Sequence, residues 1–338
     1  MKPEPKKLMV VRGLRKHFPI KGGLLGRTVK NVHAVDGIDF DVLEDETLGV
    51  VGESGCGKST TARLLMHLIA PDAGEIIFDG RTVGSREMPM AEYRRQVQMV
   101  FQDSYSSLNP RLTIEDSVAF GPRVHGVTRR EARARTHDLL ERVGLDAARY
   151  AGRYPHELSG GQRQRVNIAR ALAVRPKLII LDEAVSALDK SVEAQVLNLL
   201  SNLKTEYGLA YIFISHDLNV VRYISDRLLV MYLGRVAELG SAEGVYADPQ
   251  HPYSAALLSS MPSGDPDRRA EDSALQGDPP NPIDLPGGCR FHTRCPLVGD
   301  VCRHTEPDLF RIGDAHEVAC HARIPGSGHA AERERGAA

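Results

Sequence analysis

No stretch of the sequence reaches the ~18–20 continuous apolar residues that a helix needs to cross a bilayer. The N-terminal residues, MKPEPKKLMVV, also lack the apolar run and small-residue cleavage site of a signal peptide. We therefore expect the chain to stay in the cytoplasm.

The chain also lacks a net charge of either sign, with 43 basic against 44 acidic residues. Overall charge thus favours neither nucleic acid nor an acidic membrane surface. Arginines are dense over residues 129–142, but Glu131, Asp138 and Glu141 are interleaved with them at helical spacing. This stretch is typical of a solvated helix face, and no nucleic-acid partner is expected.

The apolar fraction of 42% suits an ordinary globular protein with a buried core. Short β-rich runs alternate with helical patterns, which predicts an α/β domain with a largely parallel sheet. Expected strands span residues 32–43, 48–51, 75–78, 177–181 and 210–214, and expected helices span 59–69, 129–143, 163–173 and 192–207. Between residues 115 and 174 the pattern is mostly helical, which indicates a helical insertion into the α/β core.

Composition divides the chain further toward its C-terminus. We expect a main domain over residues 1–250, with a helical subdomain at about 104–170. Proline- and aspartate-rich sequence predicts a linker over 251–286, followed by a small cysteine-rich extension over 287–324. Residues 325–338 are rich in glycine, alanine and charge, a composition typical of disorder.

A phosphate-binding motif lies at residues 52–59, where GESGCGKS fits the pattern G-x-x-x-x-G-K-[ST]. We call these residues the phosphate loop. The motif follows one predicted strand and opens a predicted helix, as its function requires. Backbone N–H groups of such a loop hold phosphate oxygens. Lys58 is expected to reach the β- and γ-phosphates of a nucleotide, and the Ser59 hydroxyl to ligate Mg²⁺.

A buried strand ends in two adjacent carboxylates, Asp182 and Glu183. Neighbouring residues on a strand point in opposite directions, which suits two separate tasks. After a phosphate loop, Asp182 is expected to hold Mg²⁺ and Glu183 to orient and polarise the attacking water.

A second glycine-rich turn, Ser159-Gly160-Gly161-Gln162, precedes a strongly helical stretch. We call it the signature turn. A serine and two glycines that open a helix form another anion site. One chain cannot easily direct both anion sites at one triphosphate, whereas two chains arranged head to tail can.

These motifs, in this order, resemble the ATP-binding cassette (ABC) family, a P-loop NTPase fold with an antiparallel β subdomain. The resemblance implies that the signature turn contacts the γ-phosphate on the partner subunit, with Asp189 of SALD (residues 186–189) at the dimer interface. It makes Gln102 a sensor of Mg²⁺ and of the transmembrane partner, and His216 a clamp on the γ-phosphate. Phe18 occupies the position of an aromatic that stacks on adenine, although residues 19–31 form an insertion. The resemblance also implies that the residues in contact with ATP are Gly52, Ser54, Gly55, Cys56, Gly57, Lys58, Ser59 and Thr60.

Further strings resemble the ATP-binding subunits of bacterial oligopeptide and dipeptide importers. They are HFPIKGGLLGR (residues 17–27), SYSSLNP (104–110), YPHEL (154–158) and HPY (251–253). The resemblance implies an ATPase on the cytoplasmic face of the membrane, paired with a second ATPase subunit as a heterodimer. Two transmembrane permease subunits and an extracytoplasmic substrate-binding protein complete such systems. Related subunits serve nickel and glutathione uptake, and a soluble ABC ATPase that is not a transporter is the rival class.

Four of the five cysteines lie within the C-terminal extension, at Cys289, Cys295, Cys302 and Cys320. In a reducing cytoplasm, such clustering favours metal ligands over disulfides. The spacing C-x₅-C-x₆-C-x₁₇-C matches neither the usual zinc spacing nor the bacterial ferredoxin spacing, so zinc, an iron–sulfur cluster and free thiols all stay open. Similar extensions in peptide-importer subunits carry a [4Fe–4S] cluster, and the resemblance implies one here, with zinc as the alternative.

Overall fold

The computed structural model describes residues 6–22, 27–261, 277–278, 280–313 and 316–331. The chain divides into two compact units. The first contains residues 1–9, 42–47 and 77–215, and the second contains residues 10–41, 48–76 and 216–338.

A parallel sheet forms the centre of the first unit, from β6 (Val97–Val100), β7 (Leu178–Asp182) and β8 (Ala210–Ile214). β7 lies between the other two strands, with Leu178 opposite both Val97 and Ala210. All residues of β7 and β8 are buried, as their continuous apolar runs predict for strands covered on both faces. β8 has the bounds that the sequence predicts.

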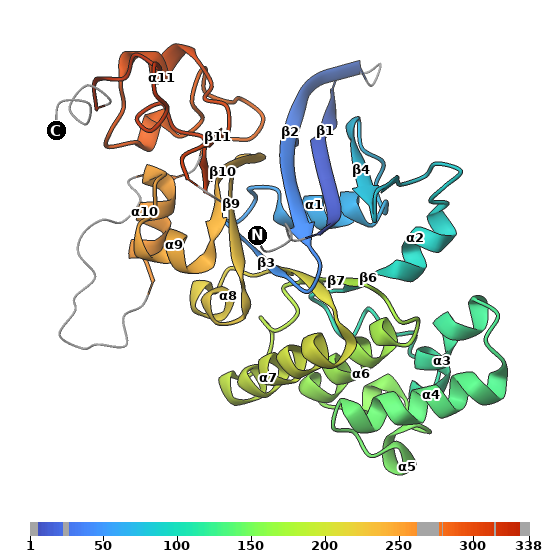
Figure 1. Ribbon diagram of the computed structural model, residues 1–338. Helices are drawn as coiled ribbons and strands as arrows, with labels where there is room; N and C mark the ends of the chain where they lie inside the picture. Colours follow the sequence, from blue (N-terminus) through green and yellow to red (C-terminus); the bar gives the residue numbers. More distant parts are fainter. Residues whose placement is uncertain (1–5, 23–26, 262–276, 279, 314–315, 332–338) are drawn as a thin grey trace. The chain divides into compact units, whose positions relative to one another are not determined.

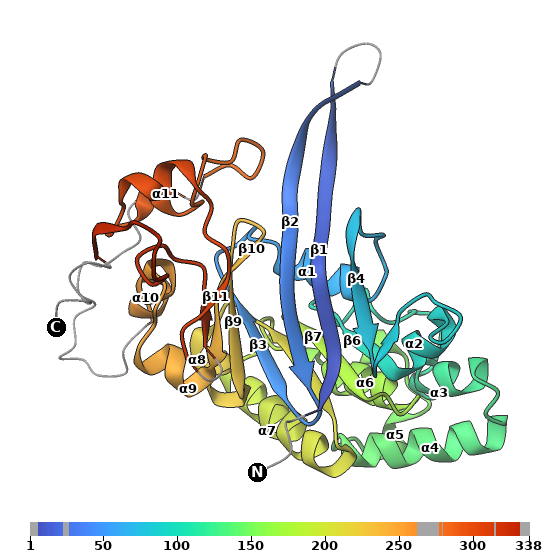
Figure 2. The same ribbon diagram turned by 45° about the horizontal axis from the view of Figure 1, so that its top comes forward.

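Helices make up most of the rest of the first unit, and α3 and α4 are neighbours in Figures 1 and 2. Both α3 and α4 have an N-cap residue whose side chain accepts a hydrogen bond from the first turn. In the arginine-rich α4, Thr128 and Glu131 form a capping box. The elements are β5 (Arg81–Thr82), α2 (Met90–Gln96), α3 (Ile114–Val124), α4 (Arg129–Arg142), α5 (Ala147–Tyr150), η1 (Pro155–Glu157), α6 (Gly160–Leu172) and α7 (Lys190–Tyr207).

The second unit contains its own strands, among which β3 (Thr47–Val51) pairs in parallel with β9 (Arg227–Tyr232). β9 continues through a tight turn into its antiparallel neighbour β10 (Arg235–Ser241). The short strands β11 (Phe310–Arg311) and β12 (Glu317–Val318) extend this sheet from the far end of the chain. The second unit also contains the helices α1 (Lys58–Leu65), α8 (Leu218–Ile224) and α9 (Ala242–Ala247).

Two long strands, β1 (Lys7–Gly22) and β2 (Arg27–Leu43), lie side by side in both ribbon views. β4 (Ala73–Phe78) is the neighbour of β1 on its other side. β2 begins at residue 27, five residues before the predicted strand. Much of the insertion at 19–31 therefore lengthens the β-ribbon.

The C-terminal part of the second unit contains α10 (Pro252–Ser259), η2 (His292–Arg294) and α11 (Asp300–His304). α10 lies inside the stretch 251–286 that composition favours as a linker, and its Tyr253 is fully buried. Val318, Cys320 and Ala322 form a small apolar cluster with Ile312 and Ala331. We refer to the described residues from 280 to 331 as the C-terminal extension. Of the tail predicted to be disordered, residues 325–338, the second half (332–338) lies outside the described residues.

Candidate functional site

The phosphate loop connects the buried strand β3 to helix α1, which begins at Lys58. Gly57 precedes the helix with φ 111°, a conformation that L side chains rarely adopt. A Cβ at Gly57 would also lie 2.2 Å from the carbonyl oxygen of Ala34. The glycine therefore allows the backbone to turn tightly against β2 and to enter α1.

Lys58 is held inside its own loop. Its side-chain Nζ donates to the carbonyl oxygens of Gly52 at 2.7 Å and of Glu53 at 3.0 Å. Only 7% of Lys58 is exposed. Cys56 is buried in the same loop, and burial raises the pKa of its thiol, so it serves as a small packing residue.

The predicted carboxylate pair lies in the first unit. Asp182 is the last residue of β7 and is buried. Glu183 follows with a positive φ of 49°, and its N–H donates to the carbonyl oxygen of Ile214 at the end of β8. Its Oε2 accepts a hydrogen bond of 2.8 Å from Nε2 of Gln102. The structure thus joins two residues that lie 81 positions apart and that the sequence assigned to the same reaction.

The signature turn forms the start of α6. Ser159 is its N-cap, and the Ser159 hydroxyl accepts from the N–H of Gln162 at 3.4 Å. In return, Oε1 of Gln162 accepts from the N–H of Ser159 at 2.9 Å. The N–H groups of this first helical turn form the positive end of the helix dipole, which suits an anion supplied from outside.

Side chains of α6 also hold the loop that follows Gln102, which sequence reasoning missed. Asn167 donates from Nδ2 to the carbonyl oxygen of Ser104 at 3.0 Å, and Arg170 donates from Nη1 to that of Ser107. Arg163 lies 5.4 Å from the ring centre of Tyr105. Positions 163, 167 and 170 share one face of the helix. This spacing of polar residues in the sequence could have predicted that α6 makes polar contacts along that face.

Other predicted site residues lie apart from these bonds. Asp189 is exposed just before α7, in the first unit. In the second unit, His216 is exposed after β8, and Phe18 on β1 is 39% exposed with Nζ of Lys16 5.7 Å from its ring centre. The phosphate loop and His216 thus belong to the second unit, whereas Gln102, the carboxylates and the signature turn belong to the first.

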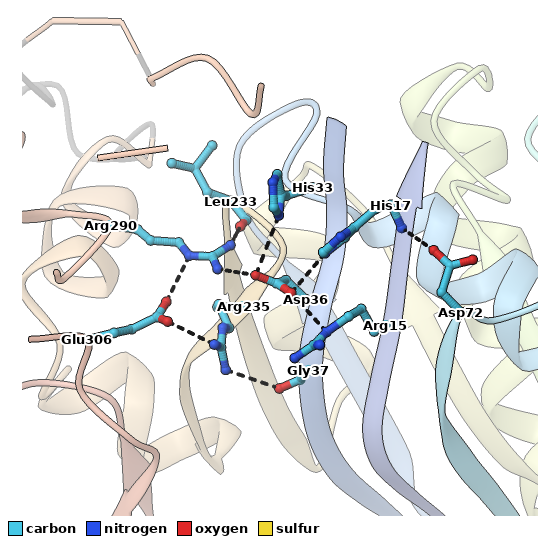
Figure 3. A network of polar contacts seen from close by, with 10 residues as sticks. All are labelled: Arg15, His17, His33, Asp36, Gly37, Asp72, Leu233, Arg235, Arg290 and Glu306. Carbon is cyan, nitrogen blue, oxygen red and sulfur yellow. Dashed lines mark hydrogen bonds and ion pairs between the residues drawn. The ribbon is translucent and has the colours of Figure 1, made fainter. Parts of the chain in front are cut away.

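Asp36 on β2 is the centre of a charged network within the second unit (Figure 3). It accepts from Nε of Arg15 at 3.1 Å, from Nε2 of His17 at 2.9 Å, and from Nη2 of Arg290. Arg290 also pairs with Glu306 at 2.8 Å and donates to the carbonyl oxygen of Leu233. Burial raises the pKa of Asp36, but hydrogen bonds from Arg290 and His17 outweigh it and hold this pKa well below its usual range.

The same residues include the one trio of candidate metal ligands within 4.8 Å of one another among the described residues, namely His17, His33 and Asp36. Two guanidinium groups already neutralise Asp36. A cation placed there would meet both fixed positive charges, so this trio is a hydrogen-bonded charge network and does not suit a metal.

The four cysteines of the C-terminal extension are all free thiols. The N–H of Cys289 donates to the carbonyl oxygen of Cys302 at 2.8 Å, and Cys320 lies in the apolar cluster beside β12. Burial raises the pKa of Cys289 to about 12 and of Cys295 to about 11, and the neighbouring thiols of the set add to both. The sulfurs are therefore close enough to oppose one another's ionisation.

Comparison with known proteins gives two family matches. Residues 35–186 match the ABC transporter family, and residues 237–302 match the C-terminal region of oligopeptide/dipeptide transporters. No helix in the described part of the chain has the length and apolar content to cross a membrane.

Near full-length relatives agree with these matches. A probable peptide ABC transporter ATP-binding protein of Sinorhizobium fredii is 50% identical, over 94% of this chain and 90% of its own length. An oligopeptide transport ATP-binding protein of Bacillus subtilis is 48% identical (93% and 97%), and one of Salmonella typhimurium is 47% identical (93% and 96%).

Solved structures include a Clostridium perfringens subunit that is part of an ABC transporter complex, with TM-score 0.61 and 29% identity over 72% of this chain and 92% of that one. A dimeric ATP-binding cassette bound to ADP and phosphate has TM-score 0.60 and 28% identity over 69% and 98%. These matches show the P-loop fold of an ABC cassette, and membership of this ATPase family implies ATP and Mg²⁺. The chain therefore belongs to the ABC transporter family, within the group of oligopeptide and dipeptide transporter ATP-binding proteins.

Proposed function

We propose that this chain is the Mg·ATP-hydrolysing subunit of an importer that takes up peptides across the cytoplasmic membrane. The observation that carries the proposal is the near full-length identity of 47–50% to ATP-binding proteins of peptide transport. The intact phosphate loop, the Gln102–Glu183 bond and the capped signature turn support a hydrolytically competent member of the family.

In the proposed reaction, the N–H groups of the phosphate loop and Lys58 bind the nucleotide phosphates. To do so, Lys58 exchanges its two carbonyl partners for phosphate oxygens. Ser59, Gln102 and Asp182 carry the family's metal-holding roles, and Mg²⁺ there would neutralise charge that develops on the phosphates. Glu183 orients the attacking water, with Gln102 fixing its carboxylate, and His216 holds the γ-phosphate.

The signature turn would act on the nucleotide of a second subunit. Its N–H groups need an anion, and the head-to-tail dimer supplies the partner's γ-phosphate to Ser159, Gly160 and Gly161, with Gln162 completing the turn and Asp189 at the interface. We propose a heterodimer on the cytoplasmic face of the membrane, bound to two permease subunits and served by an extracytoplasmic binding protein. Isolated chains should then hydrolyse ATP poorly.

The test is to purify this chain with its co-purifying membrane subunits and to measure phosphate release in proteoliposomes. Binding protein loaded with peptide should stimulate hydrolysis and uptake, and Lys58→Ala should abolish both. Stimulation by nickel- or glutathione-loaded binding protein instead would reassign the solute. A chain that purifies without any membrane subunit and hydrolyses ATP fully on its own would support the soluble, non-transport class.

We also propose that Cys289, Cys295, Cys302 and Cys320 hold a [4Fe–4S] cluster. Four thiols gathered in one extension are a complete ligand set for a cluster or for Zn²⁺. A bound group would supply structural cross-linking to a segment with few large apolar residues.

Anaerobic purification followed by metal analysis tests this assignment. Iron in amounts equal to four per chain, with absorbance near the blue edge of the visible range, would support the cluster, and Cys302→Ser should lose both. Stoichiometric zinc without iron would assign the site to zinc, and neither metal would leave the cysteines as thiols.

A further inference from the structure

Glu53, the second residue of the phosphate loop, forms a two-pronged ion pair with Arg294 of the C-terminal extension. The distances are 2.8 Å from Nη1 to Oε2 and 3.0 Å from Nη2 to Oε1. The Arg294 side chain is 5% exposed and that of Glu53 is 21% exposed. A buried, bidentate guanidinium–carboxylate pair has fixed geometry and little screening by water, unlike an ordinary surface ion pair.

The backbone of Glu53 is also held by the C-terminal part of the second unit. Its N–H donates to the hydroxyl of Tyr253 on α10 at 2.8 Å. Tyr253 packs against Tyr232 and Phe291, with ring centres 4.5 Å and 5.5 Å away. The guanidinium of Arg294 lies 6.0 Å from the ring centres of both Tyr232 and Phe291, within cation–π range. Both the main chain and the carboxylate of Glu53 therefore depend on the C-terminal part of the second unit.

A second contact reaches the loop through the turn between β9 and β10. The N–H of Gly234 donates to the carbonyl oxygen of Cys56 in the phosphate loop at 2.9 Å. Arg290 donates to the carbonyl oxygen of the preceding residue, Leu233, as Figure 3 shows. Arg290 and Arg294 thus brace the loop at two places.

Electrostatics gives the Glu53–Arg294 pair a specific consequence for nucleotide binding. A carboxylate in a loop that receives a triphosphate would repel it if its charge were unopposed. Arg294 neutralises this carboxylate and keeps it bonded, and Glu53 in turn raises the pKa of Arg294. Arg294 therefore removes a negative charge that would oppose the binding of phosphate by the loop.

We propose that Arg294 is a positioning residue for the phosphate loop, and that through it the C-terminal extension controls the affinity of the chain for nucleotide. The inference rests on the proposed function, because it concerns the same ATP site. Arg290 follows Cys289 and Arg294 precedes Cys295 in the sequence. A change in how the cysteine set is folded or occupied would therefore move both arginines and alter nucleotide affinity.

The test measures the dissociation constant of a Mg²⁺-bound, non-hydrolysable ATP analogue with the full-length chain. Arg294→Gln should weaken binding roughly tenfold, the size expected for one charge-assisted hydrogen bond. Glu53→Gln is measured alongside as the reference for the double variant. The double variant Arg294→Gln/Glu53→Gln should recover most of the lost affinity, because the unopposed charge is gone. Arg294→Lys should keep most of it.

Arg323→Gln is the matched control, since Arg323 lies in the same extension but bonds the carbonyl oxygen of Gln250. Melting temperature and thiol or metal content are measured for every variant, to separate loss of folding from loss of affinity. If Arg294→Gln and Arg323→Gln bind alike, the inference is overturned. If the double variant binds as weakly as Arg294→Gln, charge neutralisation is overturned. If the wild-type chain binds no nucleotide, the proposed function itself fails.

Discussion

Nε2 of Gln102 donates a 2.8 Å hydrogen bond to Oε2 of Glu183. The bond ties the loop after β6 to the carboxylate after β7, two neighbouring strands of one parallel sheet. Movement of the Gln102 loop would therefore displace the proposed water-orienting group. The family resemblance implies that Gln102 senses the transmembrane partner, and transport and hydrolysis would then be coupled through this bond.

Glu183→Gln should retain ATP binding and lose turnover. The amide keeps the shape of the side chain but can neither carry the charge nor accept the proton of the attacking water, so we expect hydrolysis to fall by roughly a hundred- to ten-thousandfold. Phosphate release gives the rate, and size-exclusion chromatography with ATP should reveal a trapped dimer. Glu92→Gln makes the same chemical change at a carboxylate that only bonds its helix neighbours Arg95 and Gln96. Near-normal hydrolysis by Glu183→Gln would remove this role.

Gly161→Ala should destabilise the first unit, whereas Gly160→Ala should not. A Cβ on Gly161 would lie 2.5 Å from Cγ1 of Val192, while one on Gly160 would meet only Cδ2 of Leu188 at 3.9 Å. Denaturant unfolding should show a loss of about 1–3 kcal/mol for Gly161→Ala, the usual cost of overpacking. Adding Val192→Ala should recover part of it. Equal stability of the two glycine variants would contradict the close approach of α6 and α7.

Much of the first unit and the phosphate loop could be predicted from local sequence. The continuous apolar run of β8 specifies this strand through nearest neighbours, and its bounds match the prediction. The helix predicted over 163–173 exists as α6, but it begins three residues earlier, at Gly160, because Ser159 caps it. Composition did not predict α10, which lies in the stretch expected to be a linker. Its stretch is rich in proline, yet Pro252 stands at the first helical position, where proline is favoured, and His251 caps the helix.

Contacts between distant residues could not be predicted in the same way. Glu53 and Arg294 lie 241 positions apart, and nothing in the spacing of either motif indicates the other. The insertion at 19–31 likewise had no local signal for its structure, because β1 and β2 extend by pairing with each other. Such features depend on tertiary packing, which a single sequence does not encode in any periodic form.

Arg290→Met should destabilise the second unit by on the order of 3 kcal/mol, because it leaves Asp36 and Glu306 without a shared buried partner. Chemical denaturation measures the loss. Arg311→Met, on the exposed strand β11 of the same extension, is the control and should change little. The double variant Arg290→Met/Asp36→Asn should be less destabilised than the sum of the single changes, since it removes the stranded charge. Additive losses would mean that the pair does not interact energetically.

The free energy of unfolding should decrease as the pH is lowered through the range between the unfolded and folded pKa values of His251. His251 is 4% exposed, and its Nδ1 accepts from the N–H of Tyr253 at 2.9 Å, so the folded state needs the neutral ring. Burial lowers the pKa of His251 from 6.5 to about 4. Above the unfolded pKa, both states are neutral and the group contributes no pH dependence. Between that value and about 4, only the unfolded state binds the proton, so the free energy of unfolding falls by up to about 1.4 kcal/mol per pH unit.

His251→Asn tests this window directly. Asparagine is a favourable N-cap and does not titrate, so α10 keeps a cap while the proton-binding group is lost. Denaturation midpoints of wild type and variant, measured from neutral pH down to the region of the folded pKa, should approach each other as pH falls, because the wild type alone loses the His251 contribution. Other acidic and histidine side chains titrate equally in both proteins and cancel in the comparison. Two curves that run parallel over the whole range would show that His251 is protonated equally in the folded and unfolded states.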